Sequence, residues 1–154
     1  MASNVDSIDQ KILASLVADG RQSVHGLSER VGLSPSPTAR RIKRLEDDGV
    51  ITGYHAAVDE SALGFGFNVF VSVRLARQTE HDIQRFEAEI VGFREVVDCW
   101  LMTGTFDYLI RLSVTDLAEF EAFLNRKLTR IDALAACESS IPIRRLPCQN
   151  VRLR

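Results

Sequence analysis

Residues 7–49 read SIDQKILASLVADGRQSVHGLSERVGLSPSPTARRIKRLEDDG and predict three short helices with a tight turn before the last. We expect the first helix to begin near Ser7, with Gln10 as its capping-box partner, and to end at Gly20. The turn between the second and third helices reads Val-Gly-Leu-Ser. This order is typical of a helix-turn-helix, in which one short amphipathic helix is held out from a small core to enter a DNA groove.

Apolar side chains at helical spacing predict a small core shared by these three helices. We expect the second helix to begin after its N-cap Ser23 and to end at Gly32, and Ser34 to cap the third helix. The side chains expected in this core are Ile8, Ile12, Leu13, Leu16, Val17, Val24, Leu27, Val31, Pro35, Ala39, Ile42 and Leu45.

The third helix carries four basic side chains within positions 40–44, although the whole chain has a formal net charge of -2. Phosphate recognition needs a local basic face and not a basic protein. At ~100° per residue, Arg40 and Arg44 lie opposite the expected core side. We expect the N-terminal half of this helix to read DNA, with Thr38 nearest the buried side. The expected contacts are Ser34, Ser36, Pro37, Thr38, Arg40, Arg41, Lys43 and Arg44.

A run of charge on a helix is usually a solvated face, so the basic residues alone do not establish DNA binding. The neighbouring short helix and the tight turn favour DNA over that alternative. After the third helix, residues 50–54 read VITGY and alternate in polarity, which predicts a strand or wing.

The C-terminal half predicts a ferredoxin-like β-α-β-β-α-β fold, and the whole chain an α+β protein. Strands are expected at 67–76, 96–103, 106–115 and within 137–146, with helices at 81–91 and from the cap Asp116 through Leu128. Pro142 in the last strand is compatible with a sheet edge. The expected domains are a winged helix-turn-helix over 1–55, a linker over 56–66, and a ferredoxin-like domain over 67–154.

Helices cover only one face of such a sheet, yet apolar side chains are expected on both faces. Phe70, Trp100, Met102 and Leu109 make the uncovered face too apolar for a monomer in water. We therefore expect the second domain to associate with copies of itself.

Several classes of protein are disfavoured by what the chain lacks. No apolar run is long enough to cross a bilayer, and the N-terminus MASNVDSIDQ is polar, so we expect no membrane segment or targeting peptide. We expect no metal, no cofactor and no catalysis, because the three histidines are scattered and no phosphate loop or nucleophile elbow is present. Unpaired Cys99, Cys137 and Cys148 indicate a reducing, cytoplasmic compartment and leave a redox role open.

Two segments carry a resemblance to a known family. VGLSPSPTARRIKRLEDDGVITGY (31–54) and LMTGTFDYLIRL (101–112) resemble the recognition segment and the Gly-x-x-Asp-Tyr hairpin of the Lrp/AsnC, or feast/famine, transcriptional regulators. The resemblance covers nearly the whole chain and implies a winged helix-turn-helix joined to a ferredoxin-like (RAM) domain. It also implies dimers that assemble further, into octamers or related rings. Amino acids or related metabolites bound between dimers would alter assembly or DNA affinity.

The resemblance implies an effector site at residues that match the family by position, namely Thr103, Gly104, Thr105, Asp107, Tyr108, Ser139 and Ser140. A bound amino acid needs acceptors for its ammonium and donors for its carboxylate, which Asp107 and the Gly104 turn can offer. The alternative is that Gly104 only forms the turn and Asp107 pairs with a local cation. Thr105 replaces an acidic residue often seen in the family, so the effector is not implied.

The function expected is a sequence-specific DNA-binding transcriptional regulator whose partners are double-stranded DNA, copies of itself and a small effector. One alternative is a ferredoxin-like metabolite-binding module or enzyme with a helical interaction appendage. The outward arginines of the third helix argue against it, because an enzyme has no use for them. Another is an architectural DNA binder, which would show steep salt dependence and little sequence preference.

Overall fold

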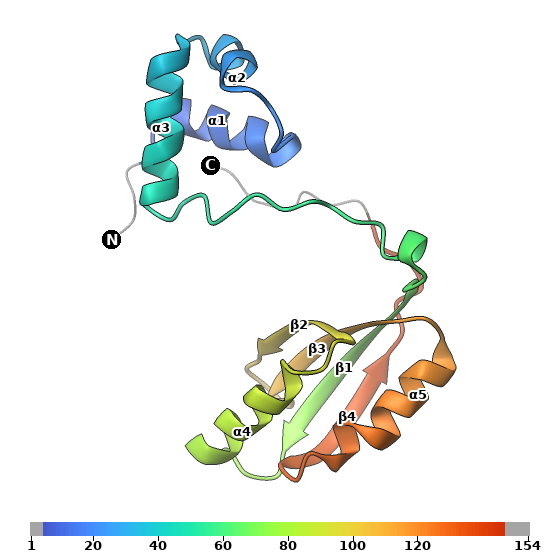
Figure 1. Ribbon diagram of the computed structural model, residues 1–154. Helices are drawn as coiled ribbons and strands as arrows, with labels where there is room; N and C mark the ends of the chain where they lie inside the picture. Colours follow the sequence, from blue (N-terminus) through green and yellow to red (C-terminus); the bar gives the residue numbers. More distant parts are fainter. Residues whose placement is uncertain (1–4, 147–154) are drawn as a thin grey trace. The chain divides into compact units, whose positions relative to one another are not determined.

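The computed structural model describes residues 5–146, which form two compact units (Figure 1). The first unit runs up to Ala57 and is helical, whereas the second, Val58–Arg145, contains a four-stranded sheet and its helices. The expected α+β class, with a helix-turn-helix followed by a ferredoxin-like domain, is confirmed.

The first unit consists of α1 (Ser7–Ala18), α2 (Val24–Val31) and α3 (Pro35–Asp47). The N-cap of α1 is Asp6, whose Oδ1 accepts hydrogen bonds from the amides of Ile8 (2.9 Å) and Asp9 (2.8 Å). Asp9 closes the capping box by accepting from the Asp6 amide at 3.1 Å. The expected pairing of Ser7 with Gln10 is therefore wrong, because an aspartate one position earlier caps the helix.

The expected punctuation of α2 is confirmed. Ser23 is its N-cap and accepts a hydrogen bond from the Gly26 amide at 3.1 Å. Gly32 ends the helix in the left-handed region, at φ +72°. Ser34 then precedes Pro35, which occupies the first turn of α3, where a missing N–H costs little.

The inward side of α3 differs from the expected one. Thr38 and Leu45 are buried and Ile42 is partly buried, whereas Pro35 and Ala39 are exposed. The hydroxyl of Thr38 donates to the Ser34 carbonyl at 3.0 Å, so its polar group is satisfied inside the unit. The buried core is otherwise close to the prediction, at Ile12, Leu27, Val31 and Leu45, but Val17 and Val24 are exposed instead of buried.

The segment that follows α3 is not a strand. Val50 and Ile51 donate their amides to the Leu45 carbonyl at 2.9 and 3.0 Å and pack against the core of the first unit. Among the described residues of this unit, no strand is present to pair with residues 50–54. The strand or wing expected from the alternating polarity of VITGY is therefore not formed, since a strand without a partner is not stable.

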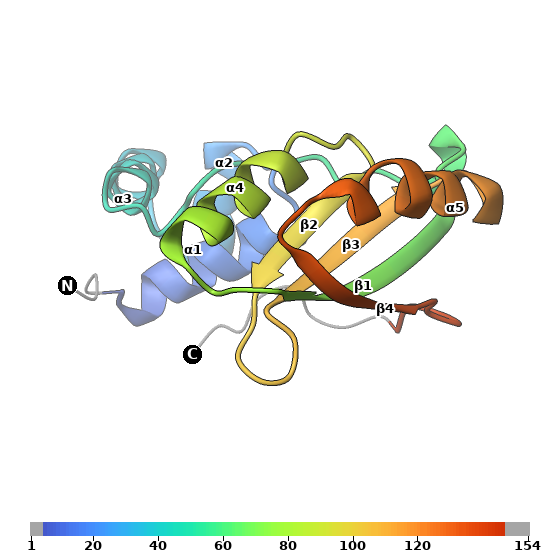
Figure 2. The same cartoon turned by 90° about the horizontal axis from the view of Figure 1, so that it is seen from below.

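The second unit follows the expected order through β1 (Phe67–Leu75), α4 (Glu80–Ile90), β2 (Val96–Leu101), β3 (Tyr108–Val114), α5 (Leu117–Arg126) and β4 (Leu134–Ser140). The antiparallel sheet has the order β2-β3-β1-β4. Figure 2 shows α4 and α5 on the same side of this sheet. β4 lies at an edge, as expected, but it begins at Leu134 and ends before Pro142.

The core of the second unit lies between the sheet and its two helices. Strand alternation confirms the expected inward set of β1, in which Val69, Val71 and Val73 are fully buried. Phe86, Ile90, Phe120 and Phe123 from the helices complete this core, and Leu117 is exposed, contrary to expectation. Asp116 caps α5 by accepting from the Glu119 amide, as expected.

The uncovered face of the sheet is mixed in polarity. Arg111 lies on it and donates to Asp98 at 2.8 Å, to Asn68 at 2.9 Å and to Glu60 at 3.2 Å. Glu60 falls within the expected linker, and it also accepts from the Ser113 hydroxyl at 2.9 Å. Residues 58–66, expected as part of a linker, therefore belong to the second unit, and a short 3₁₀ turn, Ser61–Leu63, follows Glu60.

Candidate DNA-contact helix and effector loop

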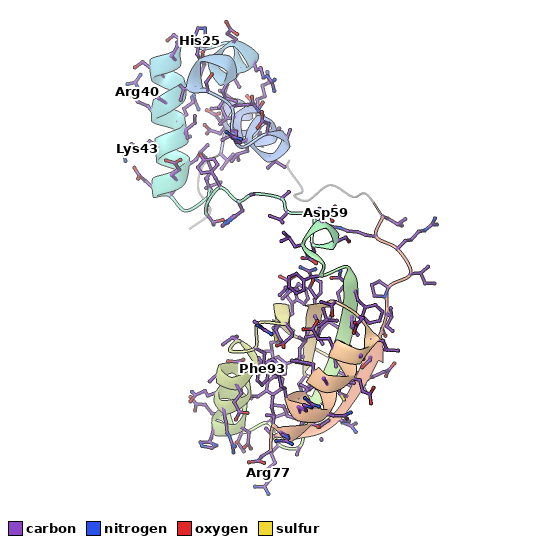
Figure 3. All side chains as sticks on the ribbon, turned by 45° about the vertical axis from the view of Figure 1, so that its right-hand side comes forward. His25, Arg40, Lys43, Asp59, Arg77 and Phe93 are labelled. Carbon is purple, nitrogen blue, oxygen red and sulfur yellow. The ribbon has the colours of Figure 1, made fainter. Side chains whose placement is uncertain are left out.

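The exposed side of α3 presents Arg40 and Lys43. Figure 3 shows both side chains on the side of α3 that is turned away from α1 and α2. Lys43 has Asp47 one turn along the helix at 3.4 Å, and both side chains are largely exposed. Within residues 5–146, Arg40 has no carboxylate within ion-pair distance. Arg40 is therefore the basic side chain of this helix that is most available to an outside phosphate or base.

Arg41 and Arg44, which the sequence assigns to DNA, instead contact the start of α1. Arg41 donates one nitrogen to Asp6 at 2.7 Å and to Asp9 at 2.8 Å, and Arg44 donates to the other oxygen of Asp9. Asp9 is fully buried. The hydrogen bonds that Arg41 donates, first to Asp6 and then to Asp9, raise the pKa of Arg41 above its usual range. These two acids were missed, although Asp at positions 6 and 9 is a recognisable capping-box spacing.

The N-terminal turn of α3 divides into exposed and buried positions. Ser34 and Ser36 are exposed and Pro37 is half-buried, so this turn can approach a surface outside the unit. Thr38 is fully buried and its hydroxyl is bonded to the Ser34 carbonyl, so it is not available to DNA. The assignment of Thr38 as a DNA contact is corrected on this ground.

The loop between β2 and β3 contains four of the residues expected to bind an effector, and it extends away from the strands (Figure 2). Thr103, Gly104 and Thr105 are exposed, and Gly104 has φ +122°, a conformation that favours glycine. Asp107 is half-buried: its carboxylate accepts from the Leu75 amide and from the Gln78 side chain, both at 2.7 Å. Its partners are therefore an amide N–H and a glutamine, not a cation.

Tyr108 does not face this loop. Its side chain is buried under α4, where the ring lies 4.7 Å from that of Phe86 and the hydroxyl donates to Glu87 at 2.9 Å. Burial, followed by the hydrogen bond to Glu87, raises the pKa of Tyr108. We therefore correct the expectation that Tyr108 contacts the effector, because β3 alternation turns it into the core.

Ser139 and Ser140 lie away from the loop. Ser140 is paired with Phe70 on one side of β1, whereas Tyr108 is paired with Val73 on its other side. The loop before Tyr108 therefore lies beyond the C-terminal end of β1, and Ser140 lies toward its N-terminal end. One chain does not bring the two expected groups of effector residues together.

A cavity of about 320 Å³ lies near the opposite end of β3 from the loop. Its walls include Glu60, Phe65, Arg94, Glu95, Val97, Ser113 and Glu119. Burial favours a raised pKa for Glu95, but a 2.6 Å hydrogen bond from Lys127 helps to hold that pKa below its usual value. The carboxylates of Glu60 and Glu119 are also bonded within the unit. Arg94 is largely exposed and approaches Glu95 only to 4.0 Å, and among residues 5–146 the second oxygen of Glu95 has no hydrogen-bond partner.

Between residues 5 and 146, no group of three or more His, Cys, Asp or Glu side chains could hold a metal ion. No helix in the same range is both long and apolar enough to cross a membrane.

Two family models match the chain, one over each unit. The first is described as winged helix-turn-helix DNA-binding and matches residues 5–52. The second is described as Lrp/AsnC ligand binding domain and matches residues 68–151.

Individual proteins are similar across both units. The Bkd operon transcriptional regulator of Pseudomonas aeruginosa is 45% identical over 140 residues, which cover 91% of this chain and 92% of that protein. The leucine-responsive regulatory protein of Haemophilus influenzae is 40% identical over 127 residues, covering 82% of this chain and 76% of that protein. A transcriptional regulator from Neisseria meningitidis, solved as a complex with L-Met, is 33% identical with a TM-score of 0.89 and covers 94% of each chain.

Proposed function

This chain belongs to the Lrp/AsnC family of DNA-binding transcriptional regulators, and from that membership we propose how it recognises DNA and its effector. It binds operator DNA through the exposed side of α3. An amino acid or a related small metabolite binds the second unit and changes DNA affinity or assembly. It acts in the cytoplasm and catalyses no reaction, in keeping with relatives that are named as regulators.

One observation carries the DNA-binding part of the proposal. Arg40 projects from α3 on the side turned away from the core and has no ion-pair partner among residues 5–146 (Figure 3). Acids at positions 46–48 crowd the C-terminal end of this helix and would repel phosphates, so the N-terminal half faces the DNA. The proposed contacts are Ser34, Ser36, Pro37, Arg40 and Lys43.

The effector is proposed to be an amino acid that contacts the loop between β2 and β3. The match to a ligand binding domain and the L-Met complex of the Neisseria meningitidis regulator support this class of ligand. The exposed Thr103, Gly104 and Thr105 supply backbone and hydroxyl groups, and Asp107 supplies a negative charge for the ammonium. Because Ser139 and Ser140 lie apart from this loop, a second copy of the chain completes the site if these serines take part.

Self-association is proposed to use the uncovered face of the sheet. Phe70 and Leu109 lie on this face at neighbouring strands, and Trp100, which is 44% exposed, extends it to the edge strand β2. Covering these side chains with the same face of a second copy removes apolar surface from water. Dimers formed in this way assemble further into octamers or related rings.

The experiment that tests this function is a titration of the full chain against labelled DNA from upstream of its own gene, with excess competitor DNA. We expect competitor-resistant binding that shifts when L-Met, L-Leu or a pool of the other amino acids is added. R40A should reduce affinity by tenfold or more, whereas R130A, which removes an exposed arginine from the second unit, should not. Absence of selective binding by the unmodified chain to any upstream fragment would contradict the proposed operator.

A further inference from the structure

Asp9 places a fully buried carboxylate between α1 and α3. One oxygen accepts from Arg41 at 2.8 Å, and the other accepts from Arg44 and from the Asp6 amide at 3.1 Å. A buried carboxylate is costly unless it is paired and hydrogen-bonded. Each oxygen of Asp9 therefore accepts a hydrogen bond from an arginine of α3.

Arg41 and Arg44 differ in how far their side chains are exposed and in how many aspartates they bond. Arg41 is 26% exposed and also bonds Asp6 at 2.7 Å, so its charge faces two acids. Arg44 is 47% exposed and, among residues 5–146, forms an ion pair with Asp9 alone. Two arginines and two aspartates cancel in charge, which reduces the attraction of this cluster for a DNA phosphate.

We propose that Asp9 is a positioning residue for DNA recognition, anchoring α3 through Arg41 and Arg44 and leaving Arg40 as the arginine of α3 that meets DNA. The proposal rests on the proposed DNA-binding function. The four basic residues of α3 then have two roles. Arg41 and Arg44 hold α3 against α1, and Arg40 and Lys43 face outward.

The first test compares R40Q, R41Q and R44Q in the full chain, with DNA affinity measured over a range of salt concentrations. A phosphate contact contributes about 0.9 to the slope of log affinity against log salt. R40Q should lower affinity at least tenfold and leave the thermal unfolding midpoint unchanged. R41Q and R44Q should lower the midpoint and leave the slope unchanged. The proposal would be overturned if R41Q or R44Q made the salt slope shallower by about 0.9 for each copy of α3 bound to DNA and left the thermal unfolding midpoint unchanged.

The second test uses D9N, which keeps an acceptor for the Asp6 amide but removes the charge that holds both arginines. Freed arginines can reach phosphates, so D9N should bind non-specific DNA with a steeper salt slope and lose discrimination for the operator. A residue that only stabilises the unit would lower affinity without steepening the slope, and that result would overturn the positioning role. If D9N does not fold, D6N releases Arg41 from one of its two acids and should steepen the slope by a smaller amount.

A double-mutant cycle separates this proposal from the proposed function. D9N, R44Q and the double variant are compared by unfolding without DNA, and the double variant should be less destabilised than the two single shifts added together. Additive shifts would overturn the anchor even if the unmodified chain binds its operator. The other outcome is that the effects of D9N and R44Q are coupled while the unmodified chain binds no DNA. That result would support the contact between α1 and α3, but it would overturn both the role of this contact in recognition and the proposed function.

Discussion

The carboxylate of Asp107 accepts a hydrogen bond from the Leu75 amide at 2.7 Å, which fastens the loop between β2 and β3 to the end of β1. The second oxygen of Asp107 accepts from Gln78, and the Asp107 amide donates to the Val73 carbonyl at 2.8 Å. A carboxylate has lone pairs enough for a further donor, so a ligand ammonium can join these partners. Asp107 thus has a structural role that is separable from its proposed role in effector binding.

Two substitutions of Asp107 separate these roles. D107A removes the partner of the Leu75 amide and should cost about 1–3 kcal/mol of stability. D107N keeps an oxygen for that amide and should cost less, but it removes the charge proposed to attract an ammonium. Urea unfolding followed by the fluorescence of Trp100, the sole tryptophan, measures the first effect in the second unit. A normal effector response in D107N would contradict the proposed ligand contact.

Y108F tests the correction made for the neighbouring residue. The hydroxyl of Tyr108 bonds Glu87, which is exposed and can exchange this partner for water. The loss should therefore cost about 0.5–1.5 kcal/mol, the ordinary contribution of one hydrogen bond. Trp100 fluorescence measures that change, and a DNA titration with amino acids should show an unchanged response. A lost response in a folded Y108F protein would return Tyr108 to the effector site.

The alternation of β1 and the two ends of α2 were predictable from sequence, because each depends on neighbours within a few positions. Val69, Val71 and Val73 show period two and are buried, and Gly32 ends α2 where no other residue adopts the required backbone as easily. The residue pairs of the candidate sites were not predictable in this way. Asp9 and Arg44 are 35 positions apart.

The inward side of α3 was predicted only in part. The helical pattern placed Thr38 nearest the buried side, and the structure buries it because its hydroxyl donates to the Ser34 carbonyl. The apolar Ala39, which was expected in the core, is exposed. The arrangement of the expected effector residues was not predictable for a different reason. The family resemblance assigns both Ser140 and the loop at Gly104 to one site, but the strand register places them apart within a single chain.

Acid should weaken the first unit through Asp6. The Asp9 amide, followed by the Arg41 side chain, holds the pKa of Asp6 at about 2, below its ordinary value of 3.8. A carboxylate whose pKa is lower in the folded state stabilises the fold above the ordinary value, and this contribution is lost as the pH falls from about 4 to about 2. D6N keeps a capping oxygen and cannot titrate.

The measurement is the thermal midpoint of the unmodified chain and of D6N, followed by circular dichroism at several pH values between 5 and 2. The difference between the two proteins should shrink as the pH falls through this window. The same comparison is then made between R41Q and the double variant R41Q/D6N. Their midpoints should differ less at pH 5 than those of the unmodified chain and D6N, because R41Q removes one of the partners that lower the pKa of Asp6. A difference that stays constant down to pH 2 would mean that Asp6 is not stabilised as a charge.

Gly32 and Gly26 provide a matched pair within α2, because the same added methyl group should have opposite effects. At Gly32 the backbone has φ +72°, and no atom lies within 4 Å of an added Cβ, so G32A should cost about 1–2 kcal/mol through backbone conformation alone. Gly26 lies inside the helix, where the nearest atom to an added Cβ is the Ser23 hydroxyl oxygen at 3.5 Å, so G26A should stabilise by up to about 1 kcal/mol. The stability of G32N should fall between those of G32A and the unmodified chain, since asparagine tolerates the left-handed region better than alanine.

Urea unfolding followed by circular dichroism at 222 nm ranks the stability of the unmodified chain, G32A, G32N and G26A. Equal stability of G32A and G26A would show that Gly32 does not hold the left-handed turn that precedes α3.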